Sequence, residues 1–145
     1  MKTLTGNIWL IIVLLAGMLA GCEVYPVDQD READPRDPFT GYWTVTEYSE
    51  EFSTFTYPVN ITKDPSNGSR LIMENFGYTG FDEKPPYGIL SGATVTIPQQ
   101  TVCNDNSMVI SGSGQLISAN SMQWNYTIII GGNQYDYTAK LEKSN

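Results

Sequence analysis

The side chains of this sequence that could do chemistry are carboxylates, with no histidine beside them. The absence of His among the 145 residues excludes the commonest general base, the commonest protein metal ligand and every Ser–His or Cys–His nucleophile. Carboxylates are available at Glu47, Glu50, Glu51, Asp82 and Glu83. Glycoside hydrolysis would need two of them facing each other across a cleft. We expect Glu50 and Glu51 to form a solvated turn, and we predict no catalytic residue and no enzyme activity.

Two polar loops have the composition of weak cation sites. Residues 64–68 and 104–106 are rich in Asp, Asn and Ser. Calcium, however, takes roughly six to eight converging oxygen ligands, more than either loop offers. We interpret both loops as turns, and we predict no metal site and no cofactor.

An apolar run stands at the amino-terminal end of the chain. Residues 8–20 are thirteen consecutive apolar residues that follow the positive charge of Lys2. At ~1.5 Å per residue the run is too short for a hydrocarbon core of about 30 Å. It has the length of the hydrophobic region of a signal peptide.

The apolar run ends in the motif Leu19, Ala20, Gly21, Cys22. This motif resembles the lipobox of bacterial lipoproteins. The resemblance implies that residues 1–21 are a signal peptide cut before Cys22, and that the Cys22 sulfur carries a lipid. The expected partner is therefore a membrane, reached through the lipid anchor.

The segment after the motif has the composition of a tether. Residues 23–38 contain six acids, two arginines and three prolines, with almost no side chain to bury. We predict an extended, disordered linker over residues 22–38. Acidic residues soon after a lipidated cysteine resemble the export signals of Bacteroidetes surface lipoproteins. We expect an outer-membrane lipoprotein displayed at the cell surface, the alternative being a linker that only keeps the domain soluble.

Charge and cysteine content exclude two further classes of protein. The formal net charge of -8 disfavours binding to nucleic acid, whose phosphates would be repelled. With Cys22 in the processing motif, Cys103 has no intramolecular partner, so a disulfide framework is not available. We interpret Cys103 as a semi-buried thiol without a chemical role.

From residue 39 onward the sequence has the pattern of an all-β domain. Short runs rich in Thr, Tyr, Val and Ile alternate with turn residues, and no window has a helical period. Strands are predicted at 41–48, 54–63, 69–75, 87–91, 93–98, 107–117, 121–130 and 134–142. Alternation is clearest in one strand near the carboxyl end, whose shared inner face is Met122, Trp124, Tyr126, Ile128 and Ile130.

Hairpin turns at 119–120 and 131–133 make consecutive strands antiparallel neighbours. We predict that residues 39–145 form an up-and-down, lipocalin-like barrel of about eight strands, with a β-sandwich as the alternative. Gly112 and Gly114 mark either a bend in the barrel wall or a turn between two shorter strands.

Several phrases of the sequence resemble small lipocalin-like lipoproteins of Bacteroidetes. The longest is residues 34–47, which resembles the tether and first strand of those proteins. Within it, the pair Gly41 and Trp43 resembles the first-strand signature of lipocalins. The signature implies that the glycine admits a turn and that the tryptophan packs across the closed end of the barrel. Members of the small-lipoprotein family generally lack an assigned activity, so the resemblance implies a fold and a location.

Aromatic residues are the candidates for contact with a ligand or a partner. Trp43, Trp124 and Tyr126 point toward the predicted interior. Phe76, Tyr78 and Phe81 lie in a long loop at 76–87, which forms either a contact patch or a cap on one end of the barrel.

Two functions follow from these candidates. The first is a lipid-anchored binding module for a small apolar ligand or an envelope protein. The second is a structural accessory subunit of an outer-membrane complex, with a closed interior. A cavity among Trp43, Trp124 and Tyr126 would favour the first, and a solid interior with an exposed aromatic loop would favour the second.

Overall fold

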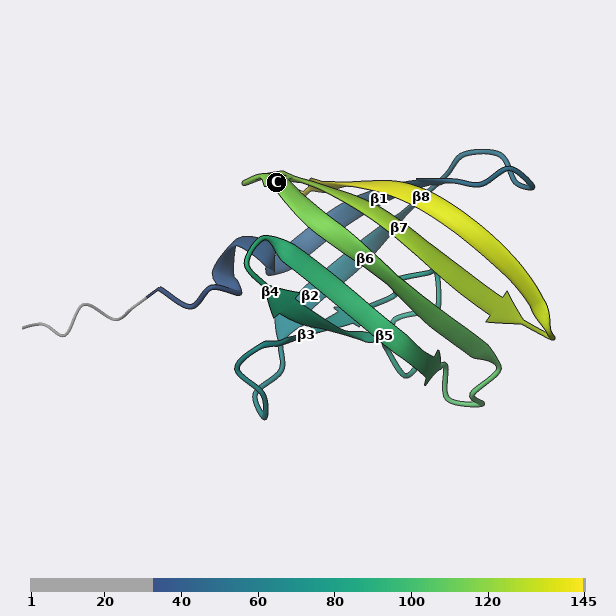
Figure 1. The fold of residues 1–145 in the computed structure, drawn as a ribbon, viewed down its shortest axis with the longest axis horizontal. Coiled ribbons are helices and arrows are strands. Elements are labelled where there is room, and N and C mark those ends of the chain that lie inside the picture. Colours follow the sequence, from purple (N-terminus) through teal and green to yellow (C-terminus); the bar gives the residue numbers. More distant parts are fainter. Residues whose placement is uncertain (1–32, 145) are drawn as a thin grey trace, which may run out of the picture. The chain divides into compact units, whose positions relative to one another are not determined.

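The computed structural model describes residues 33–144, and these residues form an all-β domain (Figure 1). Eight strands pair antiparallel in chain order, and the last pairs with the first, which closes an up-and-down barrel. The strands are β1 (Gly41–Tyr48), β2 (Phe55–Lys63), β3 (Arg70–Glu74), β4 (Tyr87–Ser91), β5 (Thr94–Val102), β6 (Met108–Ser118), β7 (Ser121–Ile130) and β8 (Asn133–Lys143). The predicted barrel is confirmed, and the sandwich alternative is wrong.

Helical structure within residues 33–144 is limited to one short turn of 3-10 helix, η1 (Asp37–Phe39). In this part of the chain no helix has the length and apolar character needed to cross a membrane.

The barrel core follows the predicted alternation. Met122, Trp124, Tyr126 and Ile128 of β7 are buried, and the side chains between them face outward. Ile130 is 44% exposed because β7 ends there. Each large apolar side chain that is fully buried contributes about 1.5–3 kcal/mol to folding, so these inner faces hold the closed sheet together.

Strand β5 continues past the residue at which the sequence predicts its end. Pro98 lacks an N–H for the sheet, and the β5–β6 register shifts between Ile97 and Gln100. The Gln100 side chain takes over the missing pairing. Its Nε2 donates to the Tyr87 carbonyl oxygen at 2.8 Å, and its Oε1 accepts from the Tyr87 N–H at 3.1 Å. This side-chain bridge allows β5 to reach Val102.

Gly112 and Gly114 lie within the continuous strand β6, opposite Tyr126 and Trp124 of β7. A Cβ atom on Gly112 would lie 2.4 Å from the Tyr126 Cβ, and one on Gly114 would lie 2.0 Å from the Trp124 ring. The alternative of a turn between two shorter strands is therefore wrong, and both glycines lie in the barrel wall. The two glycines leave the inner surface open for the large side chains of the neighbouring strand.

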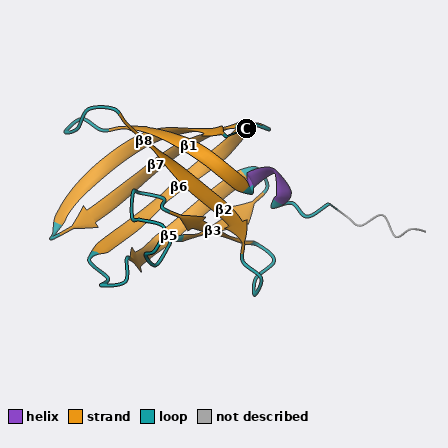
Figure 2. Cartoon of the chain, turned by 180° about the vertical axis from the view of Figure 1, so that it is seen from behind, coloured by secondary structure: helices purple, strands orange, loops and turns teal. Residues whose placement is uncertain are grey.

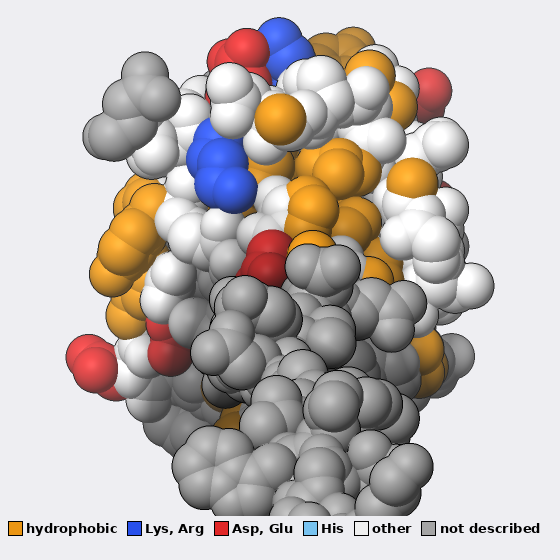
Figure 3. Space-filling model, turned by 90° about the vertical axis from the view of Figure 1, so that its left-hand side faces the viewer, with side chains coloured by type: hydrophobic (Ala, Val, Ile, Leu, Met, Phe, Trp, Pro, Cys, Tyr) orange, Lys and Arg blue, Asp and Glu red, His pale blue; other side chains and the backbone are white. Residues whose placement is uncertain are grey.

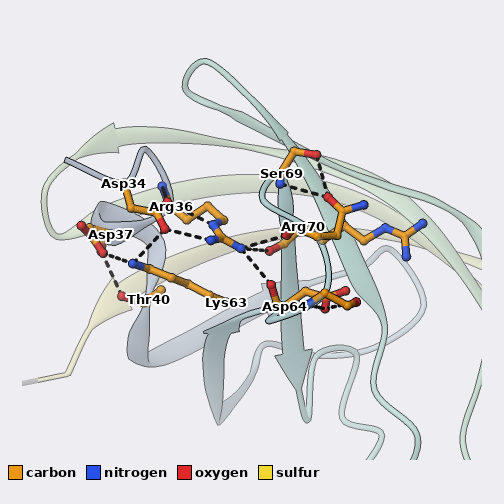
Figure 4. Close-up of polar contacts among 10 residues, drawn as sticks. Asp34, Arg36, Asp37, Thr40, Lys63, Asp64, Ser69 and Arg70 are labelled. Atoms are coloured by element: carbon orange, nitrogen blue, oxygen red, sulfur yellow. Dashed lines mark hydrogen bonds and ion pairs between the residues drawn. The ribbon is translucent and has the colours of Figure 1, made fainter. Parts of the chain in front are cut away.

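One end of the barrel is covered by the segment that precedes β1. The Arg36 guanidinium donates to the carbonyl oxygens of Asp64 at 3.0 Å and Asn67 at 2.9 Å, in the loop between β2 and β3 (Figure 4). It also binds Asp34, with Nη2 2.8 Å from Oδ2. Viewed from this end, basic side chains lie beside acidic ones, with apolar side chains visible between them (Figure 3). We call it the closed end.

The same segment departs from the predicted tether. Composition assigns residues 22–38 to a disordered linker, yet Asp34 and Asp37 both pair with Lys63 at the closed end. Ion pairs and carbonyl contacts with residues far along the chain hold residues 34–38 against the barrel. Residues 22–32 of the predicted tether and the predicted signal peptide 1–21 lie outside the described residues.

Gly41 and Trp43 do what the lipocalin signature implies. Gly41 has a φ of 113°, a conformation that side-chain-bearing residues rarely adopt, and it turns the chain into β1. Trp43 is fully buried, and its indole N–H donates to the Phe39 carbonyl oxygen at 2.8 Å. Phe39 is 2% exposed, so the segment before β1 also contributes to the core.

The opposite end of the barrel is its mouth. The loops 49–54, 75–86, 103–107 and 131–132 lie there, because antiparallel strands place alternate connections at the same end (Figure 2). Residues 33–144 thus hold every strand pairing of the closed sheet together with the core inside it. This unit has the contacts that a domain needs to fold alone.

Candidate functional site

The three interior aromatics proposed as ligand contacts are core residues. Trp43, Trp124 and Tyr126 are 0%, 1% and 3% exposed. Phe76 packs against two of them, with ring centroids 4.8 Å from Trp124 and 5.0 Å from Tyr126. Of the three, only Tyr126 lines a pocket described below, so these rings act as packing residues of the core.

The long aromatic loop both caps the interior and exposes rings to solvent. Asn75 is buried, and its Nδ2 donates to the Pro58 carbonyl oxygen at 2.7 Å. This contact, with a φ of 64° at Asn75, brings the next residue, Phe76, into the barrel. Tyr78 and Phe81 are 61% and 47% exposed. Of the three candidates in this loop, Phe76 is a cap and the other two lie on the surface.

A polar cluster lies just above this packed layer. Tyr57 donates its hydroxyl to Glu47 Oε2 at 2.9 Å, and the Tyr126 hydroxyl donates to the same oxygen. The Gly77 N–H donates to the Tyr57 hydroxyl oxygen at 3.2 Å. Sequence reasoning treats Glu47 as one carboxylate among five and gives it no role. The alternation of β1 could have identified it, because Trp43, Val45 and Glu47 share the inner face.

The environment keeps the two hydroxyls of this cluster protonated. Burial raises the pKa of Tyr57 above its ordinary value, and the negative charge of Glu47 raises it further. Burial is also the main cause of the raised pKa of Tyr126, followed by the charges of its neighbours Tyr57 and Glu47. Both phenols therefore remain donors to the carboxylate.

A pocket opens beside Glu47, between the 49–54 loop and β8. It has a volume of about 340 Å³ and is lined by Glu47, Ser49, Phe52, Ser53, Thr54, Phe55 and Tyr137. Glu47 Oε1 accepts no hydrogen bond from residues 33–144, whereas Oε2 accepts two. We call this space the mouth pocket. It is lined by apolar rings and by one carboxylate residue, Glu47.

The rings of the mouth pocket are held by neighbouring aromatics. Tyr137 stacks on Tyr126 with centroids 5.2 Å apart and planes at 15°. Phe55 lies 5.7 Å from Tyr57 and 4.9 Å from Tyr78. Offset and edge-on contacts of this kind are worth about 0.5–1.5 kcal/mol each beyond area burial, so the rings of Phe55 and Tyr137 are positioned before any ligand arrives.

A larger pocket of about 670 Å³ adjoins the mouth pocket and shares Ser49 and Tyr137 with it. Its other walls include Asn125, Thr127 and Asp136, polar side chains on the outer face of β7 and β8. It is an open groove of mixed character, in which Tyr48 and Tyr126 also lie. The mouth pocket is the better candidate because apolar rings and a polar group converge in it.

The loops at the mouth are strongly acidic. They carry Glu50, Glu51, Asp82, Glu83 and Asp105, against one basic residue, Lys84. Four other basic residues, Arg36, Lys63, Arg70 and Lys143, lie at the closed end. The acidic loops give the mouth a negative potential, which attracts cations and repels anions.

Metal and thiol chemistry have little support in the described part of the chain. Among residues 33–144 no three His, Cys, Asp or Glu side chains come together as a possible metal site. Cys103 is buried, and burial raises the pKa of its thiol, with Glu83 and Asp105 adding to the effect. The thiol is therefore held in its unreactive form. The predicted processing motif Leu19, Ala20, Gly21 and the lipidation site Cys22 lie outside the described residues.

Comparison with known proteins supports the fold. A redesigned β-barrel superposes with a TM-score of 0.57 at 13% identity, covering 77% of this chain and 96% of that one. The redesigned barrel mFAP1 bound to DFHBI gives 0.53 at 15%, covering 77% and 100%. The barrel EF1p2_mFAP2b bound to DFHBI gives 0.52 at 16%, covering 77% and 98%. The chain is thus an eight-stranded, lipocalin-like barrel similar to designed ones. No protein-family model and no curated protein sequence matches.

Proposed function

We propose that this chain is a lipid-anchored binding protein of the bacterial cell envelope that holds a small molecule in the mouth pocket. The observation that carries the proposal is the mouth pocket itself. The rings of Phe52, Phe55 and Tyr137 line it together with the carboxylate residue Glu47, and neighbouring aromatic rings hold Phe55 and Tyr137 in place. Small-molecule sites typically combine such apolar walls with a few placed polar groups.

Two further facts support binding without catalysis. The chain has no histidine, and the carboxylate in the pocket has two tyrosines as its partners and no second acid. Designed barrels of similar fold are bound to DFHBI, which supports small-molecule binding as a use of this architecture. The mouth pocket is distinct from the interior cavity that the sequence left open as a possibility, since Phe76 packs against Trp124 and Tyr126 inside the barrel.

The anchor is proposed from the sequence. Leu19, Ala20, Gly21 and Cys22 follow an apolar run of signal-peptide length. Lipid on Cys22 would place the protein in the outer membrane, and the acids of residues 23–32 support display at the cell surface.

Native mass spectrometry of residues 23–145, purified from the source cells, tests the binding function. We expect the barrel to retain a small molecule. A Phe52→Ala variant should lose that mass, and Tyr42→Ala should keep it, because Tyr42 is an equally exposed ring at the closed end. A bare mass for the parent protein, even after incubation with a small-molecule extract of the source cells, would refute the proposal.

The exposed rings of Tyr78 and Phe81 favour a second function, contact with another envelope protein. They lie on one loop at the mouth and leave apolar surface in water. A photo-crosslinking residue at position 81 should then join the chain to one partner in intact cells, whereas the same residue at position 42 should not. Equal crosslinking from both positions would argue against a specific contact.

A further inference from the structure

Glu47 is a carboxylate in the barrel mouth without a basic partner. Among residues 33–144 the ion pairs involve Arg36, Lys63 and Lys140, and none of them reaches Glu47. Tyr57 and Tyr126 donate hydrogen bonds to Oε2, but neutral phenols leave the negative charge in place. A partly buried charge of this kind is costly unless a counter-ion pairs with it.

The rings around Glu47 are also suited to a positive charge. Phe52, Phe55 and Tyr137 line the same pocket as the carboxylate. The face of an aromatic ring is electron-rich and attracts a cation that lies within about 6 Å of its centre. A cation in the mouth pocket would therefore meet the carboxylate on one side and ring faces on others.

We infer that the ligand of the mouth pocket is a protonated primary amine carried on an apolar group, with its ammonium group donating to Glu47 Oε1. This inference rests on the proposed function, since it names the ligand class for the same pocket. The apolar group would lie against Phe52, Phe55 and Tyr137, and the ammonium would neutralise the only carboxylate that lines the pocket.

Other ligand classes leave part of the site unsatisfied. A neutral apolar ligand would cover Glu47 and remove its remaining water without replacing the lost hydrogen bond. A quaternary ammonium has no N–H to donate to Oε1. An anion would be repelled by Glu47 at short range and by the acidic loops at longer range. A protonated amine satisfies the carboxylate, the rings and the field of the mouth together.

Three probes that share a phenylethyl group separate these classes. Phenethylamine is a cation near neutral pH, phenethyl alcohol is neutral and hydrocinnamate is an anion. Calorimetric titration of residues 23–145 should give an affinity for the amine about tenfold or more above that for the alcohol, because a charge-assisted hydrogen bond replaces a neutral one. Hydrocinnamate should not bind measurably.

Two acid-to-amide variants test the role of the carboxylate. Glu47→Gln keeps an oxygen that accepts from Tyr57 and Tyr126, so the barrel should fold. It should lower the amine affinity about tenfold and leave alcohol binding within about twofold. Glu51→Gln removes an exposed charge from the neighbouring loop and should change either affinity by less than about twofold. Phe52→Leu keeps apolar bulk without a ring, and it should lower the affinity for the amine more than the affinity for the alcohol.

The outcomes separate the ligand class from the proposed function. The inference of an amine ligand would be overturned if amine and alcohol bound with equal affinity and Glu47→Gln changed neither affinity. The mouth pocket would then be a site for a neutral ligand. Tighter binding of hydrocinnamate would also overturn the inference of an amine. Failure of all three probes, together with a bare native mass, would instead remove the proposed function itself.

Discussion

At the scale of single residues, the central feature is a glutamate that accepts hydrogen bonds from two buried tyrosines. Tyr57 and Tyr126 both donate to Oε2 of Glu47, a residue that lines the mouth pocket, and its Oε1 accepts no hydrogen bond from residues 33–144. The carboxylate is therefore oriented before a ligand binds, which reduces the conformational entropy lost on binding.

This arrangement predicts unusual behaviour of the tyrosines at alkaline pH. The pKa values of Tyr57, Tyr126 and Tyr137 are raised above the ordinary 10.0, mainly by burial. Their contribution to stability is present below pH 10.0 and is lost as the pH rises through the raised values. In an absorbance titration of phenolate, Tyr57→Phe and Tyr126→Phe should therefore give the same signal as the parent until the barrel unfolds. A smaller phenolate signal in either variant while the barrel is still folded would contradict the account.

At the scale of elements, strand β6 depends on two glycines that make room for β7. Gly114→Ala would bring a Cβ to 2.0 Å from the Trp124 ring, a contact that backbone or ring must relieve by moving. We expect a loss of about 1–3 kcal/mol in the free energy of unfolding, measured by urea denaturation. Gly68→Ala is the control, because nothing lies within 4 Å of its added Cβ, and it should change stability by less than about 0.5 kcal/mol. Equal effects of the two substitutions would contradict the packing described for β6.

The ion pairs of the segment before β1 should make the stability of the barrel depend on pH in the acid range. Hydrogen bonds from Arg36 and Lys63 hold the pKa of Asp34 well below its ordinary 3.8. A lowered pKa contributes stability that is full above the ordinary value and is lost as the pH falls through the lowered one.

The parent should therefore be more stable than Asp34→Asn at neutral pH, and the gap should narrow as the pH falls below 3.8. Asp82→Asn is the control, because the Asp82 carboxylate accepts no hydrogen bond from residues 33–144. Thermal unfolding at several pH values measures both. A gap that does not change with pH would show that Asp34 acts through packing alone.

The elements also show what a sequence can predict. All eight strands are found because period-two alternation reports directly on which side chains face the core. The segment at 34–38 is misjudged because its proline and acid content resembles a linker, while Arg36 binds carbonyl oxygens about thirty residues away. The end of β5 is missed because a proline such as Pro98 usually ends a strand. Nothing in the local sequence shows that the Gln100 side chain replaces the lost backbone pairing.

The sequence predicts only part of the candidate site, because local patterns do not show contacts between distant segments. Aromatic content identifies Trp43 and Trp124 as interior, but whether interior rings line a cavity or fill it depends on Phe76, from a distant loop. Glu47 could have been found from the alternation of β1, and Tyr57 lies on the next strand, whereas Tyr126 comes from β7, far away in sequence.

At the scale of the whole molecule, the acidic loops and the point where the chain enters the barrel lie at opposite ends. The acidic loops lie at the mouth, and the chain enters the barrel at the closed end. Residues 23–32 would connect a lipid on Cys22 to the closed end of the barrel. The chain therefore joins the barrel at the end opposite the mouth.

The anchor predicts how the full chain divides between membrane and solution. Cys22→Ala should release the protein from the membrane fraction of its source cells, because a thioether-linked lipid needs the cysteine sulfur. Cys103→Ala should leave partitioning unchanged, since that thiol is buried in the barrel. Fractionation followed by immunoblotting measures both variants. A Cys22→Ala protein that stays with the membranes like the parent would refute the anchor.

The central claim is that the mouth pocket is the binding site, and the position of a bound probe tests it most directly. Nuclear Overhauser effects between phenethylamine and residues 23–145 should connect the probe to ring protons of Phe52, Phe55 and Tyr137. The effects to Phe55 and Tyr137 should also disappear in Phe52→Ala, which should lose the ligand, while the rest of the barrel spectrum remains. Effects to Tyr78, Phe81 or the outer face of β7 and β8, with none to the three pocket rings, would contradict the claim.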